Sequence, residues 1–377
     1  MRKLIWLFFL LSPLAGWGQM QQRVEIPAQI YTDDYHLIPT GSDGLLFFKP
    51  EDEKNHYLFQ KYSVDLQPQW QQLLASRQQL PYRKHYLSKH YLYVLFAKPS
   101  GADLEILKLD IHSGLYQQFS FASLNNLEVW SMVAQQDDIY LEGQVLSLPI
   151  LLHLRLGAPG TRALAVDYQH KSEFQGFYVD TIRNQVHVSL LRPHAFQSYR
   201  VDIYCYHRGE QKEHYFLEGE KGYQLLNGQL VHVNDQEVLI VGNYALDKSQ
   251  RYTQGIYVAR LDGNHQEKLR QYYDYSDLKN YFNYLSPDQQ TEAQKRLQKV
   301  KNKEKDFPLY FRSHLQPIVY HQGQYILIDN SYEAELMSQQ FSTTRPANII
   351  FGGLRYSHAT VVAFDQKGDC CGIITLN

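Results

Sequence analysis

The chain has 377 residues, a formal net charge of −2 at pH 7, 44% hydrophobic residues and 20% charged residues. This composition supports a packed core and excludes a disordered chain, and the near-neutral charge argues against a nucleic-acid partner, which would require a marked basic excess. The length allows two ordinary domains or one large all-β domain.

The N-terminus has the pattern of a secretory signal peptide. Two basic residues precede an apolar run over 4–11, and small residues at 15–18 suit cleavage near Gln19. This apolar run is too short to cross a bilayer, which takes about twenty residues. We therefore predict a signal peptide over residues 1–19 and no transmembrane segment after its removal. The protein is expected to be exported to the periplasm, the cell surface or the medium.

Aromatic residues are unusually frequent, with 30 Tyr, 18 Phe and 4 Trp. Aromatic side chains fit the half-buried surface of a pleated sheet, so this tyrosine-rich composition favours β-structure. A tyrosine face also suits sugar or peptide binding, but we interpret most of these residues as sheet packing.

From about residue 30 onward, short runs rich in Tyr, Val, Leu and Ile alternate with turn residues, which is typical of many short antiparallel strands. One unit recurs: a strand ends in an aliphatic residue and usually Asp, and a polar or glycine-containing turn follows. The marker positions of this unit are Asp65, Asp110, Arg155, His207, Asp262 and Asp365. The first four intervals are 45, 45, 52 and 55 residues. They fall near the length of a four-stranded propeller blade, about 40 to 50 residues.

The repeat predicts an all-β fold, a beta-propeller-like series of four-stranded antiparallel sheets with about six to seven blades. Each small sheet cannot bury both faces alone, and stacking of neighbouring sheets covers them. We expect one domain over residues 20–377. An incomplete set of blades remains open as an alternative to a complete one. A β-sandwich with a helical excursion is the competing architecture.

One segment interrupts the strand pattern. Apolar residues at helical spacing over 278–285 predict a short amphipathic helix. Ser286 followed by Pro287 then predicts the start of a second helix that reaches about Lys303. The helical insertion is therefore placed at about 276–306.

Several stretches within 239–335 resemble a known group of proteins. They are LIVGNY at 239–244, QGIY at 254–257 and YILIDNSY at 325–332, with the lysine-rich helix between them. In these stretches the chain resembles uncharacterised exported beta-propeller-like proteins of Bacteroidota-type bacteria. The resemblance implies a propeller fold and an exported location, but it implies no activity and carries over no functional residue.

The C-terminus departs from that group. Its members continue with a further Leu-Trp-Asp-type strand after the strand equivalent to 361–365, whereas here the chain continues through Cys370 and Cys371 to its end. Codons for the last residues can encode the expected strand in another reading frame, so we expect residues 369–377 to be a frameshifted end. Two adjacent cysteines without further ligands at suitable spacing are a poor metal site.

No sequence pattern points to catalysis. Adjacent acids such as Asp137 and Asp138 lie in turn-like contexts and do not supply the opposed carboxyl pair of a glycosidase. The 16 histidines lack metal-binding spacing, and neither a nucleophile elbow nor a phosphate-binding glycine loop occurs. We therefore predict no catalytic residue, no metal site and no cofactor, and a non-enzymatic protein in preference to an enzyme.

One polar run suggests a binding site. It follows the apolar stretch 325–328 and would lie at a strand end, where side chains can line the central mouth of a propeller. The candidate ligand-binding residues are His314, Asp329, Asn330, Tyr332 and Glu333. The competing interpretation is that these side chains make turn and cap hydrogen bonds.

Two functions follow from these observations. The first is an exported, non-enzymatic binding or scaffold protein whose partner is a protein or glycan at the cell envelope. The second is a secreted hydrolase of glycans or peptides, which rests only on the versatility of the fold. A pocket that unites two carboxyl groups roughly 5–10 Å apart would favour the hydrolase.

Overall fold

The computed structural model describes residues 23–25, 35–51, 56–98, 101–168, 172–194, 198–246, 252–278, 280–303, 305–339 and 348–376. The predicted signal peptide at 1–19 lies outside the described residues. The chain divides into two compact units, Met1–Val129 and Trp130–Asn377.

The first unit contains two antiparallel four-stranded sheets, each with its strands in chain order. The strands of the first sheet are β1 (His36–Pro39), β2 (Leu45–Pro50), β3 (His56–Tyr62) and β4 (Pro68–Ala75), with the 3-10 turn η2 (Gly41–Asp43) before β2. The strands of the second sheet are β5 (Tyr82–Leu87), β6 (Tyr91–Ala97), β7 (Asp103–Asp110) and β8 (Tyr116–Ala122). Apolar side chains of both sheets, such as Phe48, Phe59, Val94 and Leu107, form one core.

The third and fourth sheets have the same antiparallel order. The third contains β9 (Leu127–Gln135), β10 (Asp138–Val145), β11 (Leu148–Arg155) and β12 (Arg162–Ala163). The fourth contains β13 (Glu173–Asp180), β14 (Gln185–Pro193), β15 (Tyr199–His207) and β16 (Glu210–Glu218).

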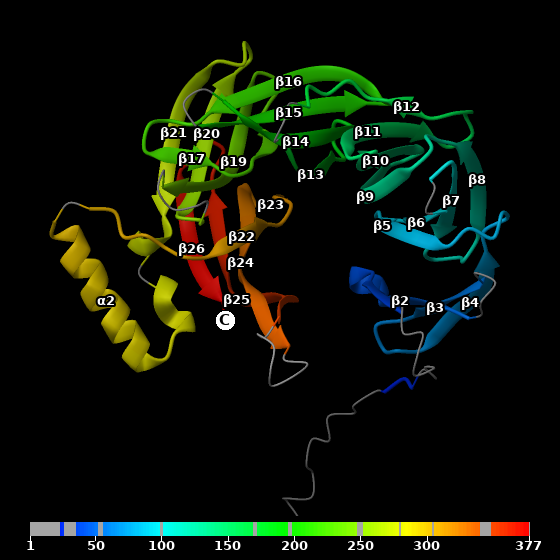
Figure 1. Cartoon of the computed structure of the whole chain (residues 1–377), viewed down its shortest axis with the longest axis horizontal. Coiled ribbons are helices and arrows are strands. Elements are labelled where there is room, and N and C mark those ends of the chain that lie inside the picture. Colours follow the sequence, from blue (N-terminus) through cyan, green and yellow to red (C-terminus); the bar gives the residue numbers. More distant parts are fainter. Residues whose placement is uncertain are drawn as a thin grey trace, which may run out of the picture. The chain divides into compact units, whose positions relative to one another are not determined.

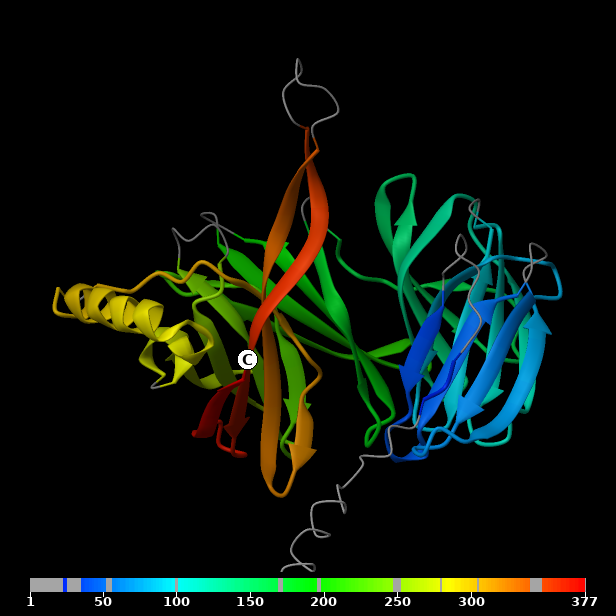
Figure 2. The same cartoon turned by 90° about the horizontal axis from the view of Figure 1, so that it is seen from below.

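In the fifth and sixth sheets, two short segments pair with the same long strand in place of a single first strand. The fifth sheet contains β17 (Tyr223–Leu225), β18 (Gln229–His232), β19 (Glu237–Leu246), β20 (Gly255–Asp262) and β21 (Glu267–Asp274). The sixth contains β22 (Arg312–Leu315), β23 (Val319–His321), β24 (Gln324–Gln339), β25 (Asn348–Phe364) and β26 (Cys370–Leu376). Figure 2 shows β24 and β25 continuing as a long twisted ribbon beyond the rest of their sheet.

These sheets confirm the predicted fold class. The described residues form six small antiparallel sheets that follow one another along the chain, and not the two large sheets of a sandwich. Figure 1 shows this succession for the third to sixth sheets. The six marker positions of the repeat fall at, or just after, the end of the third strand of each blade: β3, β7, β11, β15, β20 and β25.

The aspartate of the repeat has a local structural cause. Asp110 Oδ1 accepts hydrogen bonds from the backbone N–H groups of His112 and Ser113 at 2.9 and 2.8 Å. The carboxylates of Asp262 and Asp365 make the same kind of bond to their own turns. An aspartate that accepts from the backbone two or three residues ahead starts a tight turn, so the motif recurs where the third strand turns into the fourth.

The helical insertion is present, but its first part differs from the prediction. The described residues of 278–285 form no α-helix. The 3-10 turn η4 (Tyr275–Asp277) precedes them and the 3-10 turn η5 (Tyr281–Tyr284) lies among them, and the side chains of Tyr281 and Phe282 are buried. Tertiary packing of these aromatic residues outweighs the local helical pattern.

The second predicted helix is confirmed as α2 (Pro287–Lys301). Ser286 is its N-cap and forms a capping box with Gln289. Figure 1 shows α2 at the edge of the unit beside η5, and Ala293 and Leu297 contribute partly buried side chains to the core below. Within the described part of the chain, no helix combines the length and the apolar character needed to cross a membrane.

Neighbouring sheets of the second unit share their cores. Between the fourth and fifth sheets, the apolar cluster includes Leu191, Val201, Ile203, Leu230 and Ile240. Between the fifth and sixth sheets and the helical insertion, it includes Val241, Val258, Tyr281, Leu327 and Phe364. The candidate site lies at one end of the first of these two interfaces.

Candidate functional site

One face of the fourth sheet changes from apolar to polar along its strands. In the register, His187 lies opposite Cys205, and Cys205 lies opposite Glu213, so these three side chains form a row on the same face. Further along the same strands, Leu191 lies opposite Val201 in the apolar core shared with the fifth sheet. The polar row therefore lies at one end of the interface between the two sheets.

The fifth sheet brings two turns to this end of the interface. His232 is the last residue of β18, before the turn into β19, and Asp262 is the last residue of β20, before the turn that contains His265. Arg183 comes from the turn between β13 and β14 of the fourth sheet. Three hairpin turns from two sheets thus converge on one region.

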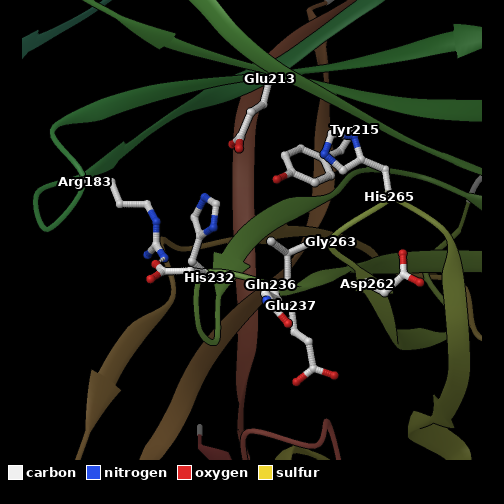
Figure 3. Close-up of a pocket in the computed structure, with 11 residues that line it drawn as sticks. Arg183, Glu213, Tyr215, His232, Gln236, Glu237, Asp262, Gly263 and His265 are labelled. Carbon is white, nitrogen blue, oxygen red and sulfur yellow. Dashed lines mark hydrogen bonds and ion pairs between the residues drawn. The ribbon is translucent and has the colours of Figure 1, made fainter.

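A cavity of about 190 Å³ lies between these turns and is called the interface pocket below. Only Val238 and Gly263 among its lining residues lack a polar side chain. The charged and aromatic side chains that line it include Arg183, Glu213, Tyr215, His232, Asp262 and His265. Figure 3 shows Glu213 and Tyr215 extending from the fourth sheet toward His232 and His265.

Aromatic rings form one wall of the interface pocket. The rings of Tyr215 and His265 have centroids 4.2 Å apart and planes inclined by 31°, and the His232 ring lies edge-on to Tyr215 at 6.4 Å. Burial, together with the nearby Glu213 carboxylate, raises the pKa of Tyr215. The phenol is therefore neutral at physiological pH and can donate a hydrogen bond.

The charges of the interface pocket are unevenly paired. The Arg183 guanidinium donates to Asp235 Oδ1 at 2.9 Å, and Asp262 accepts from Lys268 at 2.7 Å. Glu213 has no ion pair among the described residues, and its Oε2 atom is buried without a hydrogen-bond partner. Glu213 is thus the carboxylate in this pocket that lacks a cation.

A second group of side chains adjoins the pocket and shares His232 with it. One carboxylate oxygen of Asp180 and one ring nitrogen each of His187 and His232 all lie within 4.8 Å of one another. These three residues are called the His–Asp cluster below. The two imidazole centroids are 5.8 Å apart, and the Nε2 atom of each ring is buried without a hydrogen-bond partner.

The environment keeps both imidazoles of the His–Asp cluster neutral. Burial, with the neighbouring His232, lowers the pKa of His187 to about 4. Burial also lowers the pKa of His232, and the positive charge of Arg183 acts in the same direction. Neutral imidazoles have a free lone pair, which is the form that binds a metal ion or accepts a hydrogen bond.

Of the five residues proposed from the sequence, Asp329 lies in a buried polar cluster. It is fully buried, and its Oδ2 atom accepts from the Tyr275 hydroxyl at 2.5 Å and from the Asn243 amide at 2.9 Å. Burial raises the pKa of Asp329 to about 6, although hydrogen bonds from Tyr275, Ser313 and Asn243 act in the opposite direction. This cluster lies between the fifth and sixth sheets beneath the helical insertion.

The other four residues do not join Asp329. His314 is exposed and lies opposite Asn330 in the β22–β24 register. Glu333 is exposed and pairs with Arg355 at 3.0 Å, while the Tyr332 ring lies 6.0 Å from that of Tyr356. None of the four lies at the predicted strand end: Asn330, Tyr332 and Glu333 lie within β24, which continues to Gln339, and His314 lies within β22. Adjacent strand residues point to opposite faces, which separates Asp329 from Asn330.

No sequence pattern indicates the His–Asp cluster or Glu213. Asp180 and His187 lie on the two strands of one hairpin, while His232 comes from the next sheet and Glu213 from the far edge of the fourth sheet. No fixed spacing marks such a set. The one local signal is His187 itself, a polar residue within the buried run of β14.

No family model and no curated protein matches the chain. Among solved structures, the chain is similar to YCF48 from Cyanidioschyzon merolae, with a TM-score of 0.38, 9% identity, and 76% of this chain and 74% of that chain covered. The beta-propeller domain of the Trilobed protease from Pyrococcus furiosus gives a TM-score of 0.36 at 9% identity, with coverage of 88% and 89%. The polysaccharide lyase Uly1 gives 0.38 at 11% identity, with coverage of 77% and 71%. These similarities carry no argument about activity.

Proposed function

We propose that this chain is an exported, non-enzymatic binding protein that holds a cationic group of a protein or glycan partner in the interface pocket. The observation that carries the proposal is Glu213, a carboxylate with a buried, unpaired oxygen in a pocket with polar walls. The pattern of residues 1–19 supports export.

The charges around the pocket favour a cation over an anion. Arg183 is the only lysine or arginine among the lining residues, and it already pairs with Asp235. A carboxylate that is partly withdrawn from water gains most from a partner that brings both positive charge and N–H donors. A lysine or arginine side chain and an amino sugar both have this chemistry.

The aromatic wall and the volume are consistent with such a group. The Tyr215 and His265 rings lie beside Glu213 with their planes inclined by 31°, and the Tyr215 hydroxyl interacts with the Glu213 carboxylate. Tyrosine faces attract cations and the apolar faces of sugars. A cavity of about 190 Å³ accommodates one side chain or one sugar unit and is too small for a drug-sized ligand.

Replacement of Glu213 by Gln tests the proposal. The variant removes the charge and keeps the shape, so we expect binding of lysine-containing peptides or of chitosan oligosaccharides to weaken by about tenfold or more. Isothermal titration calorimetry against the acetylated forms of the same ligands isolates the contribution of the positive charge. Glu292→Gln, on the exposed surface of α2, is the matched control.

The hydrolase alternative is tested in the same samples. Prolonged incubation with the peptide and glycan ligands is followed by mass spectrometry of the products. A cleavage activity that disappears in Glu213→Gln would overturn the non-enzymatic part of the proposal. Equal affinity for charged and acetylated ligands would overturn the choice of ligand.

A further inference from the structure

The His–Asp cluster has a chemistry that the proposed function does not use. Each imidazole has a buried Nε2 atom without a hydrogen-bond partner, and one ring nitrogen of each lies within 4.8 Å of the other and of an Asp180 carboxylate oxygen. Buried polar atoms are nearly always satisfied in folded proteins, so two neighbouring unsatisfied nitrogens require a partner. His187 is the stronger indication because its side chain is almost completely buried.

We infer that Asp180, His187 and His232 bind a divalent first-row transition metal ion, with Zn²⁺ as the preferred ion. Two imidazoles and one carboxylate are a ligand set that zinc and its neighbours accept, leaving a further coordination position open. Hard ions such as Ca²⁺ and Mg²⁺ prefer oxygen ligands and fit this set poorly.

The backbone holds the three ligands close to the required separation. Around a tetrahedral zinc ion, donor atoms bound at about 2.0–2.1 Å lie roughly 3.4 Å apart. The three donor atoms here lie within 4.8 Å of one another, so side-chain adjustments of about an ångström would close the site. Asp180 Oδ1 is held by the backbone N–H groups of Ile182 and Arg183, both at 2.9 Å.

The charge balance permits a cation in this position. The positive charge of Arg183 acts on both imidazoles, but its guanidinium donates hydrogen bonds to Asp235 Oδ1 and to the carbonyl oxygen of Asn234. The carboxylates of Asp180 and Glu213 supply negative charge around His232.

The site would join two sheets. Asp180 and His187 belong to the fourth sheet, and His232 belongs to the fifth, so a bound ion would connect neighbouring blades beside the interface pocket. The inference does not rest on the proposed function, because it is argued from the ring nitrogens of the cluster and not from Glu213; of the three ligands only His232 also lines the interface pocket. The competing interpretation is a trapped water molecule that bridges the two imidazoles.

Metal titration of the full-length mature protein tests the inference. After dialysis against a chelator, we expect one equivalent of Zn²⁺ to bind in competition with a chromogenic indicator and to raise the midpoint of thermal unfolding. Co²⁺ should give the visible absorption of a site with nitrogen ligands. His187→Gln and His232→Gln should each lower the Zn²⁺ affinity about a hundredfold, since each removes one of three protein ligands.

His194→Gln is the matched control, because His194 directly follows β14 of the fourth sheet, is partly exposed and lies outside the His–Asp cluster. The Zn²⁺ affinity of this variant should equal that of the wild type. His232 is only half-buried, so its variant keeps the test valid if His187→Gln unfolds. Absence of bound metal in the wild-type protein would overturn the inference and leave the water-bridged pair. Equal affinities in all three variants would also overturn it, because they would place the ion at another surface.

The two proposals fail separately. A loss of peptide or glycan binding in Glu213→Gln with no metal bound would leave the proposed function intact and remove the metal site. Metal binding that depends on His187, with no effect of Glu213→Gln on the binding of any peptide or glycan, would support the metal site and overturn the proposed function.

Discussion

At the scale of single residues, the Asp329 carboxyl shows how burial and hydrogen bonding oppose each other. Tyr275 and Asn243 both donate to Oδ2, which favours the ionised form. Full burial acts in the other direction and is the larger effect, so the pKa rises from 3.8 to about 6. The Oδ1 atom is buried without a hydrogen-bond partner, which leaves the ionised carboxylate incompletely solvated.

This shift predicts a dependence of stability on pH. The folded protein holds the Asp329 proton more tightly than the unfolded chain does, so ionisation destabilises the fold as the pH rises from about 4 through about 6. The full effect is about 3 kcal/mol above that range. Asp329→Asn cannot ionise and so escapes this destabilisation. The unfolding free energy of the variant minus that of the wild type should therefore rise by about 3 kcal/mol between pH 4 and pH 7.

Urea unfolding of both proteins across this pH range measures the difference. Glu333→Gln, at an exposed position on the same strand, is the control and should show little dependence on pH. A wild-type to Asp329→Asn difference that stays constant over the range would contradict the assignment of a raised pKa to Asp329.

Two glycines in the first sheet allow a test of backbone strain. Gly44 has φ +96°, and a Cβ atom there would lie 2.2 Å from the backbone oxygen of Tyr62. Gly41 also has positive φ, +66°, but a Cβ atom there meets no atom within 4 Å. Gly41→Ala should cost about 1 kcal/mol of unfolding free energy, whereas Gly44→Ala should cost several times more because the backbone must move. Equal losses in thermal unfolding would show that the turn accommodates the methyl group.

At the scale of elements, the recurring aspartate connects the sequence motif to a turn. The Asp110 carboxylate satisfies two backbone N–H groups that the strand ladder leaves free. Comparison of the chain's repeats with one another marks this residue, and the hydrogen bonds explain why a turn into the fourth strand selects an aspartate.

Removal of this carboxylate should weaken the turn. Asp110→Ala loses both hydrogen bonds and should lower the unfolding free energy by about 1–2 kcal/mol. Asp365→Ala should have a similar effect, because its carboxylate accepts from Lys367 and Asp369. Chemical denaturation measures both variants, and values within error of the wild type would show that water replaces the carboxylate without loss.

The helical insertion shows the limits of local pattern. The spacing of apolar residues over 278–285 correctly marks side chains that pack inward, but it does not distinguish an α-helix from 3-10 turns. The segment is anchored by Tyr281 and Phe282 in the core between two sheets, and this contact sets the backbone. By contrast, α2 has its own N-cap and no buried residue, so local signals suffice to define its start.

At the scale of the whole molecule, each sheet needs a neighbour. The faces of the fourth and fifth sheets that meet are apolar over most of their length, and the polar row from His187 to Glu213 occupies only one end. An interface of this kind can therefore combine a stabilising core with a binding site. The same division recurs between the fifth and sixth sheets, where Asp329 lies beside Leu327 and Val362.

Export is the prediction that concerns the whole chain. Expression of the full-length gene in a bacterial host should give a mature protein that begins near Gln19, because signal peptidase cleaves after the small residues at 15–18. Replacing Phe8 by Asp interrupts the apolar run and should leave the leader attached. Intact-mass measurement of the exported and retained fractions checks both results, and an uncleaved wild-type protein would contradict the prediction.

The sequence by itself determined the fold class, the repeat length, the ends of the third strands and the start of α2. All four depend on interactions between residues near one another along the chain: strand alternation, turn hydrogen bonds and helix capping. Asp262 and the residue pair Ser286–Pro287 are examples whose local roles could be inferred without any tertiary contact.

Only the tertiary structure decided which polar residues lie together. The sequence marks Asp329 only as a candidate ligand-binding residue, and its partners Asn243 and Tyr275 come from the fifth sheet and the helical insertion. His187 and His232 are brought together by the packing of two sheets, and it is this packing that buries their Nε2 atoms away from hydrogen-bond partners. Sites of this kind escape sequence patterns because donors and acceptors interact through space, whereas a motif records only neighbours along the chain.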